Sequence, residues 1–146
     1  MVKCAWGTTI KSHKHLDDCL TESFDLITLP GGLKNAETLS THPTVIKLLK
    51  EQKNNNKWYC AICASPALVF QPNGIFEGEI GTCYPSLSDK LADKSKINEK
   101  VVVSGKCITS QGPGTTLLYS LKIVEVLCGI EKAREIGGKM LFDGKL

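Results

Sequence analysis

Cys63 is the residue whose type and position point most clearly to chemistry. It closes the apolar run 58–63 (Trp-Tyr-Cys-Ala-Ile-Cys), which is typical of a strand buried on both faces. Ala64, Ser65 and Pro66 follow at once, and proline suits the first turn of a helix. A thiol at such a turn faces unpaired backbone N–H groups and the positive end of the helix dipole, which favour the thiolate. The same N–H groups would stabilise an oxyanion formed when the sulfur attacks a carbonyl. The sequence therefore indicates a nucleophile, while a buried core thiol stays open as the alternative.

Cys60 and Cys63 also match the C-x-x-C pattern of redox pairs and zinc sites. In the redox motif both cysteines lie at the start of the helix, whereas Cys60 lies three residues back in the predicted strand. The two side chains should therefore leave opposite faces of the sheet. A zinc site needs four ligands. The sequence has neither a second C-x-x-C motif nor an H-x₃₋₅-H pair to complete a site with Cys60 and Cys63. His13 and His15 near Cys19 form a weak ligand cluster, and we expect a solvated loop and no bound metal.

The histidines argue against proteolysis by a Cys-His pair. A cysteine protease or amidotransferase needs a histidine as base. His13, His15 and His42 all precede Cys63 in the chain, and His42 is assigned to the start of a helix.

Composition limits the classes of protein that fit this chain. Its 146 residues suit a single domain over 1–146 with a sizeable core, which aliphatic side chains must fill because aromatic residues make up only 6%. The net charge is +3 and Arg134 is the sole arginine, so the basic stripe of a nucleic-acid binder is missing. The sequence has no apolar run long enough to cross a membrane and no signal-peptide pattern. We expect a cytoplasmic protein whose seven cysteines are thiols.

Strands and helices alternate along the predicted chain. Strands are expected at 2–10, 24–29, 58–63, 79–83, 101–103 and 106–109, with the last two forming a hairpin. Helices are expected at 16–21, from Pro43 to about 54, from Ala64 onward, after Pro85, at 115–127 and at 131–136. In the helix 115–127 an apolar face is predicted from Leu117, Leu121, Val124 and Leu127. This order predicts an α/β fold with a mostly parallel sheet covered on both faces.

Three segments together resemble one family. They are Leu-Pro-Gly-Gly at 29–32, Ala-Ile-Cys-Ala-Ser-Pro at 61–66 and Thr-Ser-Gln-Gly-Pro-Gly-Thr at 109–115. In this order and spacing they are similar to the ThiJ/PfpI superfamily, in the branch of the Parkinsonism-associated deglycase often called DJ-one. The resemblance implies a flavodoxin-like three-layer sandwich and a homodimer. It also implies cofactor-free glyoxalase or protein deglycase activity on carbonyls such as methylglyoxal, with a role in oxidative-stress protection.

The resemblance also assigns roles to residues. Cys63 would be the nucleophile and the oxidation-sensitive thiol. Gly31, Gly32 and Ala64 would line the oxyanion pocket through their backbone N–H groups. The substrate pocket would be completed by Tyr84, Pro85, Gly112 and Pro113. Tyr84 falls where some relatives have a pocket histidine, and its alternative role is that of a packing aromatic.

The family also has an N-terminal strand-helix-strand that carries a glutamate beside the catalytic thiol. Every acidic residue of this chain lies at Asp17 or later, in segments that the family places elsewhere. The domain is therefore expected to be incomplete at its N-terminus relative to the family. Three alternatives to the enzyme follow: a redox-sensing or chaperone-like homodimer, an inactive shortened relative, and a binding domain with an incidental cysteine.

Overall fold

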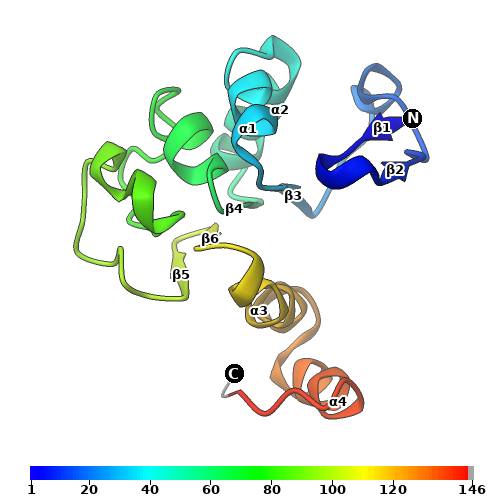
Figure 1. Cartoon of the computed structure of the whole chain (residues 1–146), viewed down its shortest axis with the longest axis vertical. Helices are drawn as coiled ribbons and strands as arrows, with labels where there is room; N and C mark the ends of the chain where they lie inside the picture. The colour runs from blue at the N-terminus through cyan, green and yellow to red at the C-terminus, as the bar shows by residue number, and fades with distance from the viewer. Residues whose placement is uncertain (145–146) are drawn as a thin grey trace.

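A mixed four-stranded sheet organises the chain in the computed structural model, which describes residues 1–144 (Figure 1). Its spatial order is β3 (Leu26–Leu29), β4 (Trp58–Ile62), β6 (Cys107–Ser110) and β5 (Val101–Ser104). The first three strands run parallel, and β5 returns antiparallel to β6. Leu29 pairs with Ala61, and Ile62 pairs with Ser110. The carboxyl ends of the three parallel strands therefore meet at one edge of the sheet, where ligands bind in open α/β folds.

Helices cover both faces of this sheet. Helices α1 (Leu33–Ser40) and α2 (Pro43–Asn54) lie on one side, and α3 (Thr116–Cys128) and α4 (Ile130–Lys139) lie on the other (Figure 1). Successive residues of β4 serve opposite layers: Tyr59 joins the cluster on the α2 side, and Cys60 joins the cluster under α3. The fold is therefore the predicted three-layer sandwich. Over residues 1–144, no helix combines the length and apolar character required to span a membrane.

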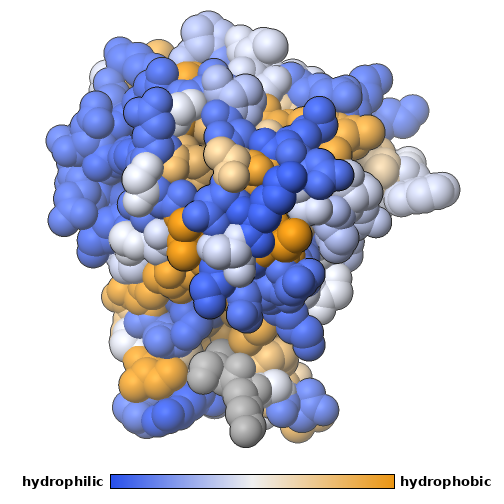
Figure 2. Space-filling view, turned by 90° about the vertical axis from the view of Figure 1, so that its left-hand side faces the viewer, coloured by the Kyte–Doolittle hydropathy of each residue, from blue (hydrophilic) through white to orange (hydrophobic). Residues whose placement is uncertain are grey.

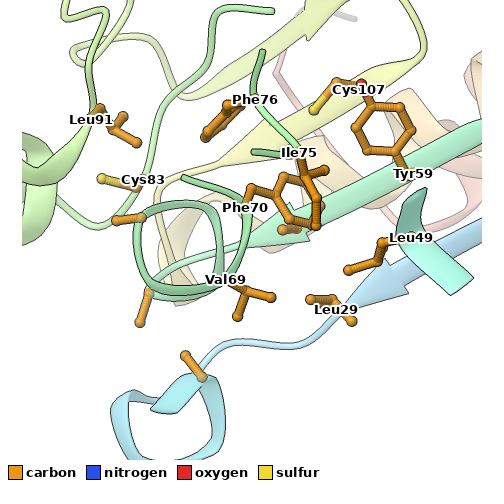
Figure 3. Packing of buried hydrophobic residues seen from close by; sticks show 14 of the residues in the cluster. Leu29, Leu49, Tyr59, Val69, Phe70, Ile75, Phe76, Cys83, Leu91 and Cys107 are labelled. Carbon is orange, nitrogen blue, oxygen red and sulfur yellow. The ribbon is translucent and has the colours of Figure 1, made fainter. Parts of the chain in front are cut away.

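The larger core cluster lies between the sheet and the α1–α2 side. Phe70 sits at its centre, with its ring centroid 5.8 Å from that of Tyr59 and 5.6 Å from that of Phe76 in an edge-on arrangement (Figure 3). Leu49 of α2 is fully buried against this cluster. Apolar patches nevertheless reach the surface between hydrophilic residues on the face shown in Figure 2.

Several predicted elements are confirmed. The hairpin of β5 and β6, helix α2 with Pro43 in its first turn, and the C-terminal pair of helices all form close to the expected positions. The segment 2–10 is not one strand but two short ones, β1 (Val2–Lys3) and β2 (Thr9–Ile10), which pair antiparallel. The segment predicted as helix at 16–21 forms a 3-10 helix at Leu16–Cys19, and helix α1 was not predicted.

The prediction of a strand at 79–83 is wrong. The segment has no regular secondary structure and forms no ladder, because side-chain hydroxyls take two of its backbone donors. The Ile80 N–H donates to Ser104 Oγ at 3.1 Å, and the Thr82 N–H donates to Thr109 Oγ1 at 2.9 Å. Hydroxyl acceptors satisfy isolated donors without continuing a sheet. The segment therefore lies beside β5 and β6 and leads the chain to Tyr84.

The apolar face predicted for α3 is also wrong in part. Leu121 is buried, but Leu117 and Leu127 are exposed. The other buried residue is Tyr119, whose hydroxyl lies 2.6 Å from Thr28 Oγ1 on β3. This hydrogen bond holds Tyr119 against the sheet, whereas Leu121 lies on the opposite side of the helix and is buried against α4.

Candidate functional site: a cysteine elbow at the sheet edge

Cys63 lies on a sharp turn between β4 and the helical turn Pro66–Phe70. Its φ is +64°, in the left-handed region that residues other than glycine seldom adopt. Such backbone conformations persist when the surroundings hold them, and they cluster at functional sites. The turn leaves the Cys63 side chain partly exposed, whereas Tyr59, Cys60 and Ala61 in the middle of the strand before it are buried.

Gly31 allows the neighbouring strand end to approach the thiol. A Cβ at position 31 would lie 2.6 Å from Cys63 Cβ and 3.3 Å from its Sγ. The first distance is far below van der Waals contact, so a larger residue could not occupy this place without a shift. The next residue, Gly32, has a φ of +92°, which also favours glycine. The structure thus brings Gly31 directly against the predicted nucleophile, with Gly32 as the next residue of the same loop.

Backbone hydrogen bonds hold the elbow at both sides. The Cys63 N–H donates to Ser110 O at 3.0 Å, and the Cys63 carbonyl accepts from the Tyr84 N–H at 2.8 Å. Within residues 1–144 the N–H groups of Gly32 and Ala64 donate to no backbone acceptor. Ala64 directly follows Cys63 in the chain, and Gly32 directly follows Gly31, which contacts the cysteine.

Two further loops lie beside the elbow, and their residues Tyr84, Pro85, Gly112 and Pro113 form what we call the second wall of the site. A Cβ at Gly112 would lie 3.4 Å from Cδ2 of Tyr84, so the tyrosine ring packs on this glycine. Tyr84 is 45% exposed, and Pro85 starts the 3-10 helix that follows it. Pro113 likewise starts the short helix after Gly112. The Tyr84 N–H bond to the elbow places this wall next to Cys63.

Side chains that the sequence analysis did not identify hold these loops in place. Ser65 Oγ donates to Pro30 O at 2.6 Å, and Asn35 Nδ2 donates to Gly31 O at 3.2 Å. Thr115 Oγ1 accepts from the Gly112 N–H at 3.0 Å. Short hydroxyl and amide side chains next to tight turns commonly bond the local backbone, and this signal was present in the sequence. The hydrogen bonds named here around the elbow involve no carboxylate.

The three buried cysteines differ chemically from a reactive thiol, because their pKa values are raised. Burial raises the pKa of the Cys60 thiol to about 12 and that of Cys83 to about 11. Burial also raises the pKa of Cys107 well above 9.0. Cys60 belongs to the cluster under α3, whereas Cys63 packs against the cluster on the opposite face. The prediction that the C-x-x-C side chains leave opposite faces is therefore confirmed, and this arrangement is not that of a redox pair.

The fold and the matched segments are shared with known proteins. A profile of the DJ-1/PfpI family matches residues 1–126. Protein DJ-1 homolog A of Arabidopsis thaliana is 49% identical over 122 residues, which are 84% of this chain and 31% of that protein. Glutathione-independent glyoxalase DJR-1.2 of Caenorhabditis elegans is 36% identical over 137 residues, which are 92% of this chain and 72% of that protein.

Solved structures agree with these matches. The structure of oxidised Toxoplasma gondii DJ-1 superposes with a TM-score of 0.94 at 34% sequence identity, covering 98% of this chain and 78% of that one. The chain thus spans less than a third of the length of the Arabidopsis relative and about three quarters of the other two. Because the family profile covers most of the chain and the fold agrees, this chain belongs to the DJ-1/PfpI family.

Proposed function

We propose that the chain is a cofactor-independent glyoxalase or protein deglycase that acts on methylglyoxal-type carbonyls through Cys63. The observation that carries this proposal is the left-handed elbow at Cys63, with Gly31 packed against its Cβ and Sγ. The name of the Caenorhabditis elegans relative, a glutathione-independent glyoxalase, supports the same reaction class.

The chemistry begins with attack of the Cys63 thiolate on the aldehyde carbon of methylglyoxal. An S–C bond forms, and the carbonyl electrons move to oxygen, giving a thiohemiacetal oxyanion. The pocket N–H groups at Gly31, Gly32 and Ala64 stabilise this charge, since preorganised donors act where charge develops. A proton then moves between the two substrate carbons, and hydrolysis of the S–C bond releases lactate and the free thiol. In the deglycase reaction the carbonyl carbon is that of a glycated protein.

The second wall shapes the space above the sulfur. Tyr84 and Gly112 pack on each other, and Pro85 and Pro113 stiffen the turns on which they lie. A phenol can donate a hydrogen bond to a substrate oxygen. We assign these four residues to substrate positioning.

A redox-sensing or chaperone-like homodimer is the second candidate. The observation that favours it is the partial exposure of Cys63 on its turn. The glyoxalase reaction needs in addition a general base for its proton transfer, which contributes about 10²–10⁴-fold. Redox sensing needs only an accessible thiolate, which oxidises to sulfenic and then sulfinic acid. Light scattering on the purified chain tests whether it forms the homodimer.

Cys63→Ala is the direct test of the glyoxalase. This substitution should abolish lactate formation from methylglyoxal and leave the melting temperature nearly unchanged, because the side chain is partly exposed on a turn. Cys60→Ala is the matched control. Cys60 is fully buried, so loss of its sulfur leaves a cavity that lowers stability without removing the nucleophile. Equal loss of turnover in the two folded variants would contradict the role of Cys63. Absence of turnover in the unmodified chain would leave redox sensing as the better proposal.

A further inference from the structure

A second thiol lies beside the elbow. Cys83 immediately precedes Tyr84, whose N–H donates to the Cys63 carbonyl at 2.8 Å. A backbone hydrogen bond of this length holds the two segments at the spacing of neighbouring strands, about 5 Å apart. Cys83 is part of the buried cluster against which Cys63 packs. The two cysteines therefore belong to one packed unit, although 19 residues separate them in the chain.

The two thiols differ in exposure. Cys63 is partly exposed, whereas Cys83 has no exposed surface and lies between the helical turn after the elbow and Leu91 (Figure 3). Burial is the main cause that raises the pKa of Cys83 to about 11, and the electrostatic influence of the nearby Cys63 adds to it. Dissolved oxidants thus reach Cys63 first, while Cys83 stays protonated and protected. When an accessible thiol such as Cys63 is oxidised to a sulfenic acid, a neighbouring protected thiol such as Cys83 can attack it and form a disulfide.

We propose that Cys83 captures the oxidised form of Cys63 as an intramolecular disulfide, so that the site reduces peroxides by a two-cysteine reaction. This inference rests on the proposed reactivity of Cys63 but not on turnover of methylglyoxal. Its substrate class is hydrogen peroxide and small alkyl hydroperoxides, and its reductant class is a dithiol.

The reaction balances in three steps. Cys63 Sγ attacks one peroxide oxygen, the O–O bond breaks, and the products are a sulfenic acid and water or an alcohol. Cys83 Sγ then attacks the sulfenic sulfur, the S–O bond breaks, and the Cys83 proton leaves with the hydroxyl group as water. The two thiols lose the two electrons that the peroxide gains. A dithiol returns these electrons by thiol–disulfide exchange and restores both cysteines.

The backbone hydrogen bond between Tyr84 and Cys63 is compatible with a disulfide between Cys63 and Cys83. A disulfide needs its Cα atoms about 4.4–6.8 Å apart, a range compatible with adjacent hydrogen-bonded segments. The Cys83 thiol now donates to Tyr84 O at 3.4 Å. An S–H group is a weak donor, so rotation about the Cα–Cβ bond of Cys83 loses little.

The remaining buried cysteines are placed differently. Cys60 faces the cluster under α3, on the opposite side of the sheet. Cys107 pairs with Tyr59 in the register of β4 and β6, whereas Ile62, next to Cys63, pairs with Ser110. Cys107 therefore lies toward the opposite end of the strands from the elbow. It is as buried as Cys83 and its pKa is also raised by burial, which makes Cys107→Ala the matched control.

The experiment treats the reduced chain with hydrogen peroxide, blocks the remaining thiols by alkylation, and maps peptides without reduction. Cleavage at lysine and glutamate places Cys63 in the peptide 58–77 and Cys83 in the peptide 80–90, so a disulfide joins two separate peptides. Fragment spectra locate the link on Cys63 or Cys60. The unmodified chain should give the linked pair as the main product, and dithiothreitol should abolish it. Cys107→Ala should behave in the same way.

Cys83→Ala should lose the linked pair and accumulate Cys63 sulfinic acid severalfold above the unmodified chain, because nothing captures the sulfenic acid. Cys83→Thr provides a second variant if the alanine variant melts early. The inference is overturned if the unmodified chain proceeds to Cys63 sulfinic acid with no linked pair, or if the link lies on Cys60. Lactate formation from methylglyoxal, measured without peroxide, reports separately on the proposed glyoxalase. A chain that makes lactate but no linked pair contradicts the disulfide alone.

Discussion

The chemistry of this site depends on a few residues whose backbone conformation matters as much as their side chains. Cys63 is turned out of its strand at a φ of +64°, and the fold must hold it there. Gly31 makes this possible because its missing side chain leaves room for the Cys63 Cβ. Ser65 and Asn35 then fix the glycine loop through its carbonyls. The reactivity of the Cys63 thiol should therefore depend on the close packing of Gly31 against it.

Gly31→Ala tests this coupling. The new Cβ would lie 2.6 Å from Cys63 Cβ, so the loop or the elbow must shift, and overpacking of this kind costs about 1–3 kcal/mol. We expect a lower melting temperature and slower alkylation of Cys63 by iodoacetamide. Gly138→Ala is the control, since a Cβ there meets nothing within 4 Å and alanine favours a helix by about 0.5–1 kcal/mol. The explanation fails if both variants melt and react like the unmodified chain.

At the level of elements, one polar contact fixes how α3 lies on the sheet. The hydroxyls of Tyr119 on α3 and Thr28 on β3 are 2.6 Å apart. The helix is apolar on most of its faces, so hydrophobic pattern alone does not select one of them. The directional hydrogen bond does: it places Tyr119 on the side of the sheet, while Leu121 is buried on the opposite side, against α4. The hydrogen bond thereby holds α3, which follows β6 in the chain, against β3, one of the strands that end at the site.

A double-mutant cycle measures this contact. Tyr119→Phe leaves the Thr28 hydroxyl without its partner and should cost about 0.5–1.5 kcal/mol of unfolding free energy. Thr28→Val should cost a similar amount, and the double variant should lose less than the sum because the hydrogen bond is absent already. Urea unfolding of the four proteins gives the coupling. Strict additivity would show that the two hydroxyls do not stabilise one another.

At the scale of the whole molecule, the interior contains several thiols and phenols that ionise only at high pH. Burial raises the pKa of Cys60, Cys83 and Cys107, and it also raises the pKa of the phenols Tyr59 and Tyr119. All five are neutral in the folded chain near neutral pH. Unfolding exposes them to water, where their thiols and phenols ionise more readily.

Stability should therefore fall as the pH rises. The unfolded thiols lose protons near pH 9.0, whereas the folded Cys83 and Cys60 keep theirs until about 11 and 12. The stabilisation is complete below pH 9.0 and is lost between these values, at up to about 1.4 kcal/mol per pH unit for each thiol. Urea unfolding on both sides of pH 9.0 checks this. Cys83→Ala should flatten the slope, whereas the exposed Cys128→Ala should not. A slope that stays flat in the unmodified chain would contradict the prediction.

Local sequence determined much of this protein. The apolar run ending at Cys63 followed by Pro66 was sufficient to predict the strand, the turn and the cysteine elbow, because hydrophobic pattern and proline act within a few residues. The order of strands and helices predicted the α/β class, while the place of Gly31 and Gly32 at the site was implied by the resemblance to the family.

Tertiary structure decided what local pattern could not. The segment 79–83 has the composition of a strand, yet hydroxyls from Ser104 and Thr109 take its N–H groups. The face of α3 was set by Thr28, more than ninety residues away. The place of Cys83 beside Cys63 follows from one backbone hydrogen bond between distant segments. Each of these outcomes depends on which partners the fold brings within about 3 Å, and a residue's neighbours in the sequence do not carry that information.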